Sequence, residues 1–283
     1  EMLLHRIDAT PDLPSFSYPQ GSGWKQGTWK EFGEQVKQIA MGLSALGLQN
    51  EERVAILSGT RYEWVAADMG ILAAAGATTT IYPSNLAEEC EYIINDSGTR
   101  YVFAEDDKQV EKLQKVRAAL KDVKHVITFD GKASDDGWVI SLAALQDKGK
   151  PASREAWDAI VKSVKNQDIA TLIYTSGTTG KPKGVVLTHD CWVYEAEGID
   201  ELRLIKPEFV QFFWLPLAVV AGILLGTGSS WEAIAWLVAR FIAVACVLMA
   251  LVSVLQPARW AEKLRRFGWW GPALAMGGAL RRR

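Results

Sequence analysis

The chain has 283 residues, of which 49% are hydrophobic, so it is long enough for one large or two modest domains with a buried core. Its formal net charge of −2 gives no signal for binding nucleic acid or other polyanions. The three cysteines, Cys90, Cys191 and Cys246, lie far apart and fit neither a disulfide framework nor a zinc site. This usage favours a reducing compartment, and we expect a cytoplasmic protein in which Cys90 is a small buried residue.

Strand-like and helix-like segments alternate from Glu52 onward. Strands are expected at Arg53–Leu57, Ala77–Tyr82, Tyr101–Ala104 and His125–Phe129, and helices at Tyr62–Ala75, Leu86–Ile94 and Asp107–Ala119. Ser84 or Asn85 is available as the N-cap of the second helix. Such alternation predicts an α/β fold with a doubly wound, largely parallel sheet.

A polar loop follows, with the sequence YTSGTTGKPKG from Tyr174 to Gly184. It lies between two apolar, β-like runs, Ile169–Tyr174 and Val185–Thr188. Glycines allow the backbone to adopt positive φ and to turn several N–H groups toward one anion, while hydroxyls and lysines add donors and positive charge. This composition predicts a site for a polyphosphate, most simply ATP.

The loop differs from a Walker A motif, which has four residues between its first glycine and its Gly-Lys pair and then opens a helix. Here two residues separate Gly177 from Gly180, Pro182 follows Lys181, and the next run is strand-like. We therefore expect the loop to join two strands without a helix dipole at the anion. The alternative is an ordinary polar hairpin whose residues only provide solubility.

The loop string closely resembles the phosphate-loop signature of the AMP-forming adenylate ligases. Residues 52–97, which begin ERVAILSGTRYEW, and residues 28–48, TWKEFGEQVKQIAMGLSALGL, resemble the N-terminal part of bacterial long-chain fatty-acid–CoA ligases. The resemblance covers about three quarters of the chain, to around Ala218. It implies three regions: an N-terminal α/β subdomain (1–165), a phosphate-loop segment that starts a second subdomain (166–218), and a divergent apolar tail (219–283).

The resemblance also implies the reaction and its participants. A long-chain fatty acid would be activated by ATP to an acyl-adenylate and then transferred to coenzyme A, with Mg²⁺ as the metal. The loop would position the β- and γ-phosphates electrostatically. Thr175 is also the candidate Mg²⁺ contact. The candidate nucleotide-binding residues are Thr175, Ser176, Gly177, Thr178, Thr179, Gly180, Lys181 and Lys183.

Outside the loop, no residue is singled out for catalysis or metal binding. His189 follows the second β-like run without an evident partner, so a structural role is favoured. The acidic residues in turns and at helix starts are expected to be solvated caps; these are Asp106, Asp107, Asp135 and Asp136.

Several elements of the resembled family are missing from the sequence. After Leu217–Ala218 the pattern stops, and no Tyr-Gly-x-Thr-Glu, Thr-Gly-Asp or C-terminal catalytic-lysine segment follows. We therefore expect a fragment that is inactive alone. The alternative is a catalytically dead, membrane-anchored nucleotide-binding or interaction protein.

The tail itself is strongly apolar. Phe209–Trp231 and Phe241–Ala258 contain no charged residue, and tryptophans and a basic C-terminus flank them. This pattern fits a two-span membrane hairpin with both ends cytoplasmic. A frameshifted or chimeric tail and a divergent buried core are the two other interpretations.

Overall fold

The computed structural model describes residues 1–175 and 181–201, all within the first of two compact units, Glu1–Gly222. A short hairpin, β1 (Pro14–Gln20) and β2 (Gly23–Thr28), precedes the main sheet. The main strands are β3 (Arg53–Leu57), β4 (Ala77–Ile81), β5 (Thr99–Ala104), β6 (His125–Thr128), β7 (Val139–Ser141), β8 (Ile169–Thr175) and β9 (Lys183–Thr188). The helices are α1 (Met2–Ala9), α2 (Trp29–Ala45), α3 (Tyr62–Ala73), α4 (Ala87–Ser97), α5 (Asp107–Lys115), α6 (Leu142–Gly149), α7 (Arg154–Ser163) and α8 (His189–Glu201).

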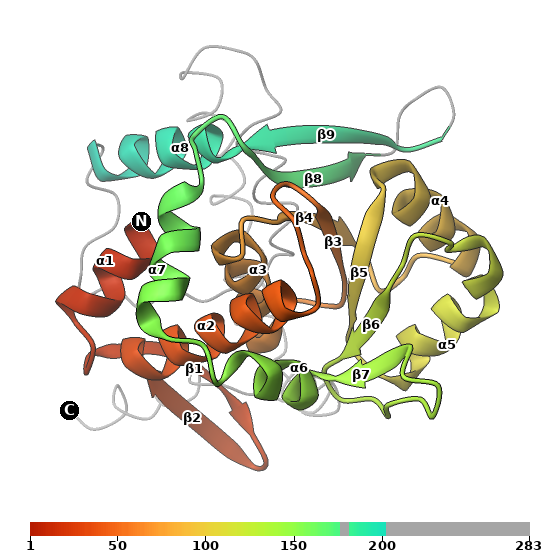
Figure 1. The fold of residues 1–283 in the computed structure, drawn as a ribbon, viewed down its shortest axis with the longest axis horizontal. Coiled ribbons are helices and arrows are strands. Elements are labelled where there is room, and N and C mark those ends of the chain that lie inside the picture. Colours follow the sequence, from red (N-terminus) through yellow and green to blue (C-terminus); the bar gives the residue numbers. More distant parts are fainter. Residues whose placement is uncertain (176–180, 202–283) are drawn as a thin grey trace, which may run out of the picture. The chain divides into compact units, whose positions relative to one another are not determined.

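The seven main strands form one sheet in the order β7-β6-β5-β3-β4-β8-β9 (Figure 1). Every neighbouring pair is parallel except β8 and β9, which are antiparallel. β8 joins the sheet beside β4, so the segment that carries the phosphate loop extends the sheet of the preceding residues. The domain boundary at residues 165–166 stays a prediction.

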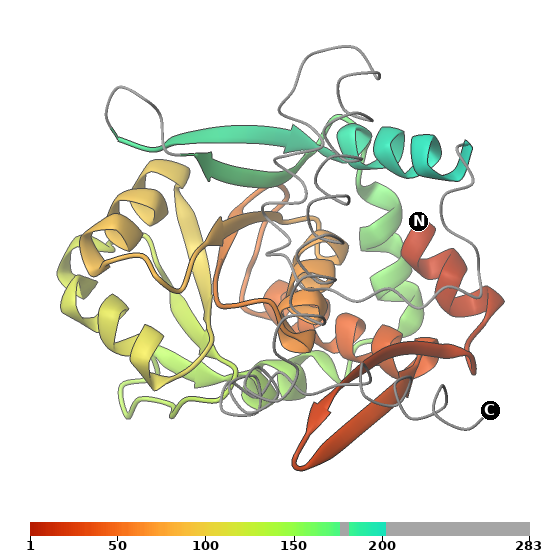
Figure 2. The same ribbon diagram turned by 180° about the vertical axis from the view of Figure 1, so that it is seen from behind.

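Helices cover both faces of this sheet, as Figures 1 and 2 show from opposite sides. Along β3, Val54 and Ile56 belong to one buried cluster with residues of α2, α3, α6 and α7. Ala55 and Leu57 belong to a second cluster with residues of α4 and α5. Successive strand residues point to opposite faces, so this division follows directly from the unbroken apolar run in β3. The predicted doubly wound α/β fold is confirmed.

Two helix predictions need correction. The N-cap of α4 is Leu86 rather than Ser84 or Asn85, and its backbone N–H donates to the Glu89 carboxylate at 2.8 Å. An acidic side chain one turn into the helix thus satisfies a free N–H without a polar cap residue. The predicted helix Asp107–Ala119 is interrupted, because α5 ends at Lys115 and a separate 3₁₀ turn, Arg117–Ala119, follows.

The two apolar runs, Phe209–Trp231 and Phe241–Ala258, lie outside the described residues, so all three interpretations of the tail stay open. Among residues 1–175 and 181–201, no helix combines the length and apolarity needed to cross a bilayer.

The carboxyl group of Asp68 in α3 should make the stability of the fold depend on pH. The hydroxyl of Thr78 on β4 donates to Asp68 at 2.6 Å, and burial raises the pKa of Asp68 to about 6. An acid whose pKa is higher in the folded protein stabilises the fold below its unfolded pKa, and this stability is lost as pH rises through about 6. The fold should therefore lose stability between about pH 4 and pH 7 through this group.

Asp68→Asn should remove that loss, because an amide can still accept the Thr78 hydrogen bond without ionising. Asp68 keeps intermediate surface exposure, so we expect the variant to gain about 1–2 kcal/mol at pH 8 rather than the about 3 kcal/mol of the whole shift. Urea unfolding at pH 4.5 and pH 8 measures the difference. An equal effect of the substitution at both pH values would contradict it.

Candidate phosphate-binding site

Two antiparallel strands hold the predicted phosphate loop. Tyr174 pairs with Gly184 and Thr175 with Lys183, so the last residues of β8 and the first of β9 are in register. The prediction that the loop joins two strands is confirmed, and no helix N-terminus follows the loop directly. Five candidate residues, Ser176, Gly177, Thr178, Thr179 and Gly180, lie outside the described residues.

The other three candidates lie at the base of the loop. Thr175, Lys181 and Lys183 all have exposed side chains. The pairing of Thr175 with Lys183 brings a hydroxyl-bearing residue and a lysine side by side on neighbouring strands. The ammonium of Lys181 lies 4.9 Å from the centre of the Tyr92 ring on α4. Lys181 and Lys183 therefore differ in their surroundings, although both were predicted from the sequence as phosphate contacts.

Gly184 lies in close contact with the side chain of Tyr174. A Cβ atom built on Gly184 would lie 3.1 to 3.3 Å from atoms of the Tyr174 side chain, closer than most such contacts. The Tyr174 hydroxyl in turn donates to the Asp96 carboxylate of α4 at 2.7 Å. Burial, followed by this carboxylate, raises the pKa of Tyr174, so the phenol stays protonated at neutral pH. The aromatic ring is thus fixed between β9 and α4.

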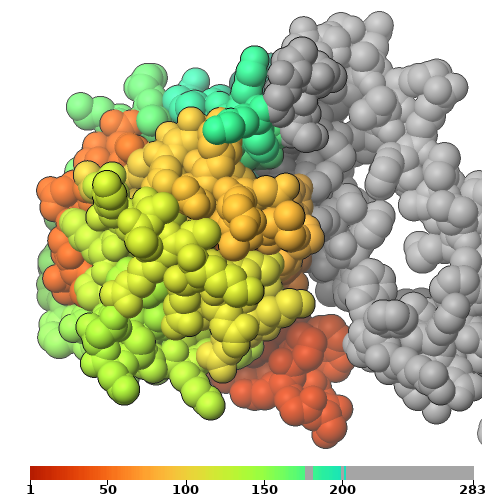
Figure 3. All heavy atoms as spheres, turned by 90° about the vertical axis from the view of Figure 1, so that its right-hand side faces the viewer, coloured from red at the N-terminus to blue at the C-terminus, as the bar shows by residue number. Residues whose placement is uncertain are grey.

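A second contact joins α4 to the far end of the loop. The Tyr92 hydroxyl donates to the backbone carbonyl of Pro182 at 3.1 Å. Figure 3 shows β9, in blue-green, lying against α4, in orange-yellow. Sequence reasoning missed the role of α4, because Tyr92 and Pro182 are 90 positions apart and only the folded sheet brings them together.

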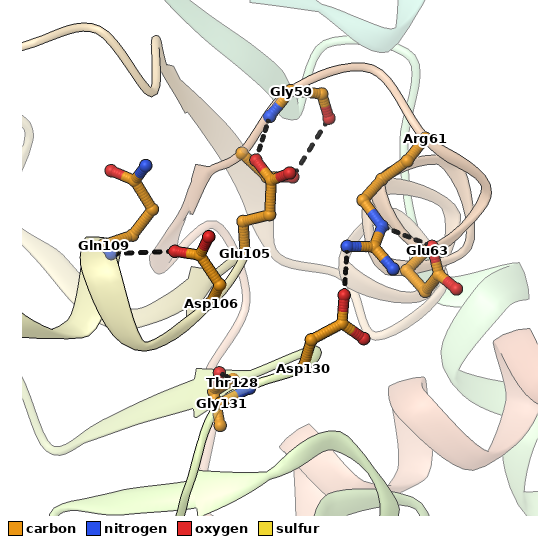
Figure 4. A network of polar contacts seen from close by, with 10 residues as sticks. Gly59, Arg61, Glu63, Glu105, Asp106, Gln109, Thr128, Asp130 and Gly131 are labelled. Carbon is orange, nitrogen blue, oxygen red and sulfur yellow. Dashed lines mark hydrogen bonds and ion pairs between the residues drawn. The ribbon is translucent and has the colours of Figure 1, made fainter. Parts of the chain in front are cut away.

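The generic ligand site of a doubly wound sheet lies elsewhere, at the carboxyl ends of β3 and β5. Their following helices, α3 and α5, pack on opposite faces, which makes this the topological switch point. Here the Glu105 carboxylate accepts the backbone N–H of Gly59 at 2.8 Å (Figure 4). The backbone N–H of Gly59, which could otherwise bind a phosphate, therefore already donates to a carboxylate of the protein itself.

Other charges around the switch point are also paired internally. Arg61 contacts Asp130 at 2.6 Å and Glu63, and Asp106 accepts the backbone N–H of Gln109 at 3.0 Å as the cap of α5 (Figure 4). The predicted capping role of Asp106 is confirmed. With four acidic groups close by, Glu63, Glu105, Asp106 and Asp130, the switch point is a poor site for a polyanion, which leaves the β8–β9 loop as the better candidate.

The remaining candidate side chains have structural surroundings. Cys90 is fully buried on α4, and burial raises the pKa of its thiol to about 11, so it is a packing residue as predicted. His189 opens α8, and burial lowers its pKa. In the part of the chain that the structure describes, no three His, Cys, Asp or Glu residues gather as a metal site.

Sequence comparison relates the chain to one family. The profile described as AMP-binding enzyme matches residues 3–267. The chain is 32% identical over 227 residues to the long-chain-fatty-acid–CoA ligase ACSBG2 of Xenopus laevis, covering 78% of this chain and 31% of the relative. It is 34% identical over 200 residues to the long-chain-fatty-acid–CoA ligase FadD15 of Mycobacterium tuberculosis, covering 70% and 32%. The chain thus spans about a third of the length of these curated relatives.

Solved structures share the fold. The anthranilate CoA ligase AuaEII in complex with anthranoyl-AMP matches with a TM-score of 0.58 at 22% identity, over 70% of this chain and 36% of that one. The fatty acyl-adenylate ligase from L. pneumophila, in complex with acyl adenylate and pyrophosphate, also gives a TM-score of 0.58 at 22% identity, over 76% and 34%. At this identity the likeness establishes the arrangement of sheet and helices.

Proposed function

The chain belongs to the AMP-binding enzyme family, and from this premise we propose that it supplies the phosphate-binding part of an AMP-forming long-chain fatty-acid–CoA ligase. The observation that carries the proposal is the β8–β9 loop, whose base places Thr175 beside Lys183. The sequence relatives are named as long-chain-fatty-acid–CoA ligases, which supports long-chain fatty acids as the substrate class. ATP, a long-chain fatty acid and coenzyme A would be the substrates.

The proposed reaction has two steps. A fatty-acid carboxylate oxygen attacks the α-phosphorus of ATP, which forms the acyl-adenylate and releases pyrophosphate. The thiol sulfur of coenzyme A then attacks the acyl carbon, loses its proton and displaces AMP. The exposed ammonium of Lys183 would offset negative charge on the β- and γ-phosphates as pyrophosphate departs. Backbone N–H groups and hydroxyls from Ser176 to Gly180 would complete the contacts with the phosphates.

Mg²⁺ is the metal that we propose for this site. The donor set fits an ion held chiefly by nucleotide oxygens, because the described residues offer the exposed Thr175 hydroxyl but no group of three His, Cys, Asp or Glu residues that could hold a metal ion. Thr175 would be the protein ligand, and the metal would neutralise phosphate charge when bound. The chain's own part remains the orientation of the polyphosphate by the loop.

Two measurements on the purified 283-residue chain test this function. Calorimetry should detect binding of ATP, and ATP–pyrophosphate exchange should be measured with and without palmitate. Exchange that depends on palmitate would support a complete adenylation site. ATP binding without exchange would fit a ligase fragment that is inactive alone and equally the alternative, a catalytically inactive nucleotide-binding protein. A folded chain that binds neither ATP nor pyrophosphate would contradict the proposal.

For location, we propose a cytoplasmic nucleotide site with membrane association through the apolar tail. Two uncharged runs, Phe209–Trp231 and Phe241–Ala258, support this. The full chain should then stay with membranes after carbonate washing, and a chain truncated before Glu208 should be released. Detergent extraction separates insertion from aggregation. A monodisperse full-length chain in detergent-free buffer would contradict membrane association.

A further inference from the structure

We infer that α4 is a positioning element for the phosphate loop, with Tyr92 and Asp96 holding opposite ends of its base. The inference also assigns different roles to the two lysines: Lys181 is a tether to α4, and Lys183 is the contact for phosphate. Its consequence for nucleotide binding rests on the proposed function, whereas its structural part does not.

The geometry of α4 carries this inference. Tyr92 and Asp96 are four residues apart, so they lie on the same face of the helix, one turn from each other. Asp96 accepts the hydroxyl of Tyr174, the residue that precedes the loop on β8, at 2.7 Å. Tyr92 donates to the Pro182 carbonyl, on the β9 side of the loop, at 3.1 Å. One helix therefore contacts Tyr174 on β8 and Pro182, the residue just before β9, on the two sides of the loop.

The Tyr92 side chain makes two contacts with different chemistry. Its hydroxyl binds a backbone carbonyl, and its ring face lies 4.9 Å from the Lys181 ammonium. A cation is attracted to the negative face of an aromatic ring, so this contact orients Lys181 toward α4. Pro182 fixes the backbone φ angle between the two anchored groups. These constraints act on the segment immediately before Lys183.

Anchoring both ends matters because the loop between them contains Gly177 and Gly180. Glycine-rich backbone loses much conformational freedom when it orders around a ligand. Fixing the ends in advance reduces that loss, and it sets where Lys183 lies when a polyphosphate arrives. The α4 contacts should therefore affect ligands that carry β- and γ-phosphates and leave AMP binding unchanged.

The test uses the full chain and three single substitutions. Tyr92→Phe removes the hydroxyl and keeps the ring under Lys181, and Tyr174→Phe removes the donor to Asp96. Tyr18→Phe, a matched hydroxyl deletion on β1, is the control. Hydrogen exchange over residues 172–188 is measured without nucleotide, and calorimetry measures binding of ATP, inorganic pyrophosphate and AMP.

Each α4-contact variant should exchange amide protons faster over residues 172–188 and bind ATP and pyrophosphate about three- to tenfold more weakly, the usual effect of one hydrogen bond. AMP affinity and the control should not change. Unchanged exchange and unchanged ATP affinity in both folded variants would overturn the inference, as would an equal loss of AMP affinity. If wild-type chain binds no ATP while exchange still accelerates in the variants, the positioning role stands and the proposed function fails.

Discussion

Replacing Lys183 with alanine is expected to weaken ATP binding by about ten- to a hundredfold, because a charge-assisted contact to phosphate is worth about 1.5–3 kcal/mol. Lys183 opens β9 with an exposed side chain, and it pairs in the sheet with Thr175. The substitution leaves the backbone pairing in place, so the strand should still form. Calorimetric titration of wild type and variant with ATP measures the effect.

Lys115→Ala is the matched control, because this lysine is also exposed but lies in the last turn of α5. Salt screens the contact between Lys183 and phosphate in the wild type. The difference in ATP affinity between the wild type and Lys183→Ala should therefore shrink as salt concentration rises. Equal ATP affinity in the two folded variants would assign the loop to structure alone.

The largest effect on stability is expected from Gly149→Ala, at the crossing of α6 and α2. A Cβ atom on Gly149 would lie 2.0 Å from the Gln38 carbonyl oxygen and 2.8 Å from the Gly42 nitrogen. Both neighbours are backbone atoms of α2, so neither can rotate away as a side chain could. The helices must separate, and overpacking of this kind should cost about 3 kcal/mol.

Urea unfolding of the full chain measures this cost as a shift of the midpoint. Gly23→Ala on β2 is the control, since a Cβ atom there meets no atom within 4 Å. The two variants should differ by most of the expected 3 kcal/mol or so. Equal midpoints would mean that α2 and α6 do not approach each other this closely in solution.

The elements of the sheet could be read from the sequence where apolar runs are long. The strands β3 to β6 and the helix α3 were predicted close to their observed bounds. In this part of the chain, short runs of β-branched and apolar residues alternate with segments of helix-like sequence. The strand β7 was not predicted, because the three residues Val139–Ser141 are too few to show an alternation of apolar and polar residues. The order of the strands in the sheet could not be predicted either. The chain crosses β3 on its way from β4 to β5, and no local sequence pattern indicates that crossing.

The candidate site divides in the same way. The loop could be recognised from Tyr174–Gly184 because glycines, hydroxyls and lysines are contiguous there, and the expected strands on both sides are observed. The partners on α4 could not, because a tyrosine and an aspartate within an ordinary amphipathic helix have no distinguishing pattern. The different surroundings of Lys181 and Lys183 likewise arise only when α4 packs beside the β8–β9 hairpin.

The central claim is that the loop between β8 and β9 binds the phosphates of ATP. Hydrogen exchange of the full chain, compared with and without saturating ATP, tests it most directly. The claim predicts that ATP slows exchange most strongly in peptides spanning residues 174–184, and that AMP slows it much less there. Protection centred instead on Gly59 and Glu105 at the switch point, with residues 174–184 unchanged, would contradict the claim.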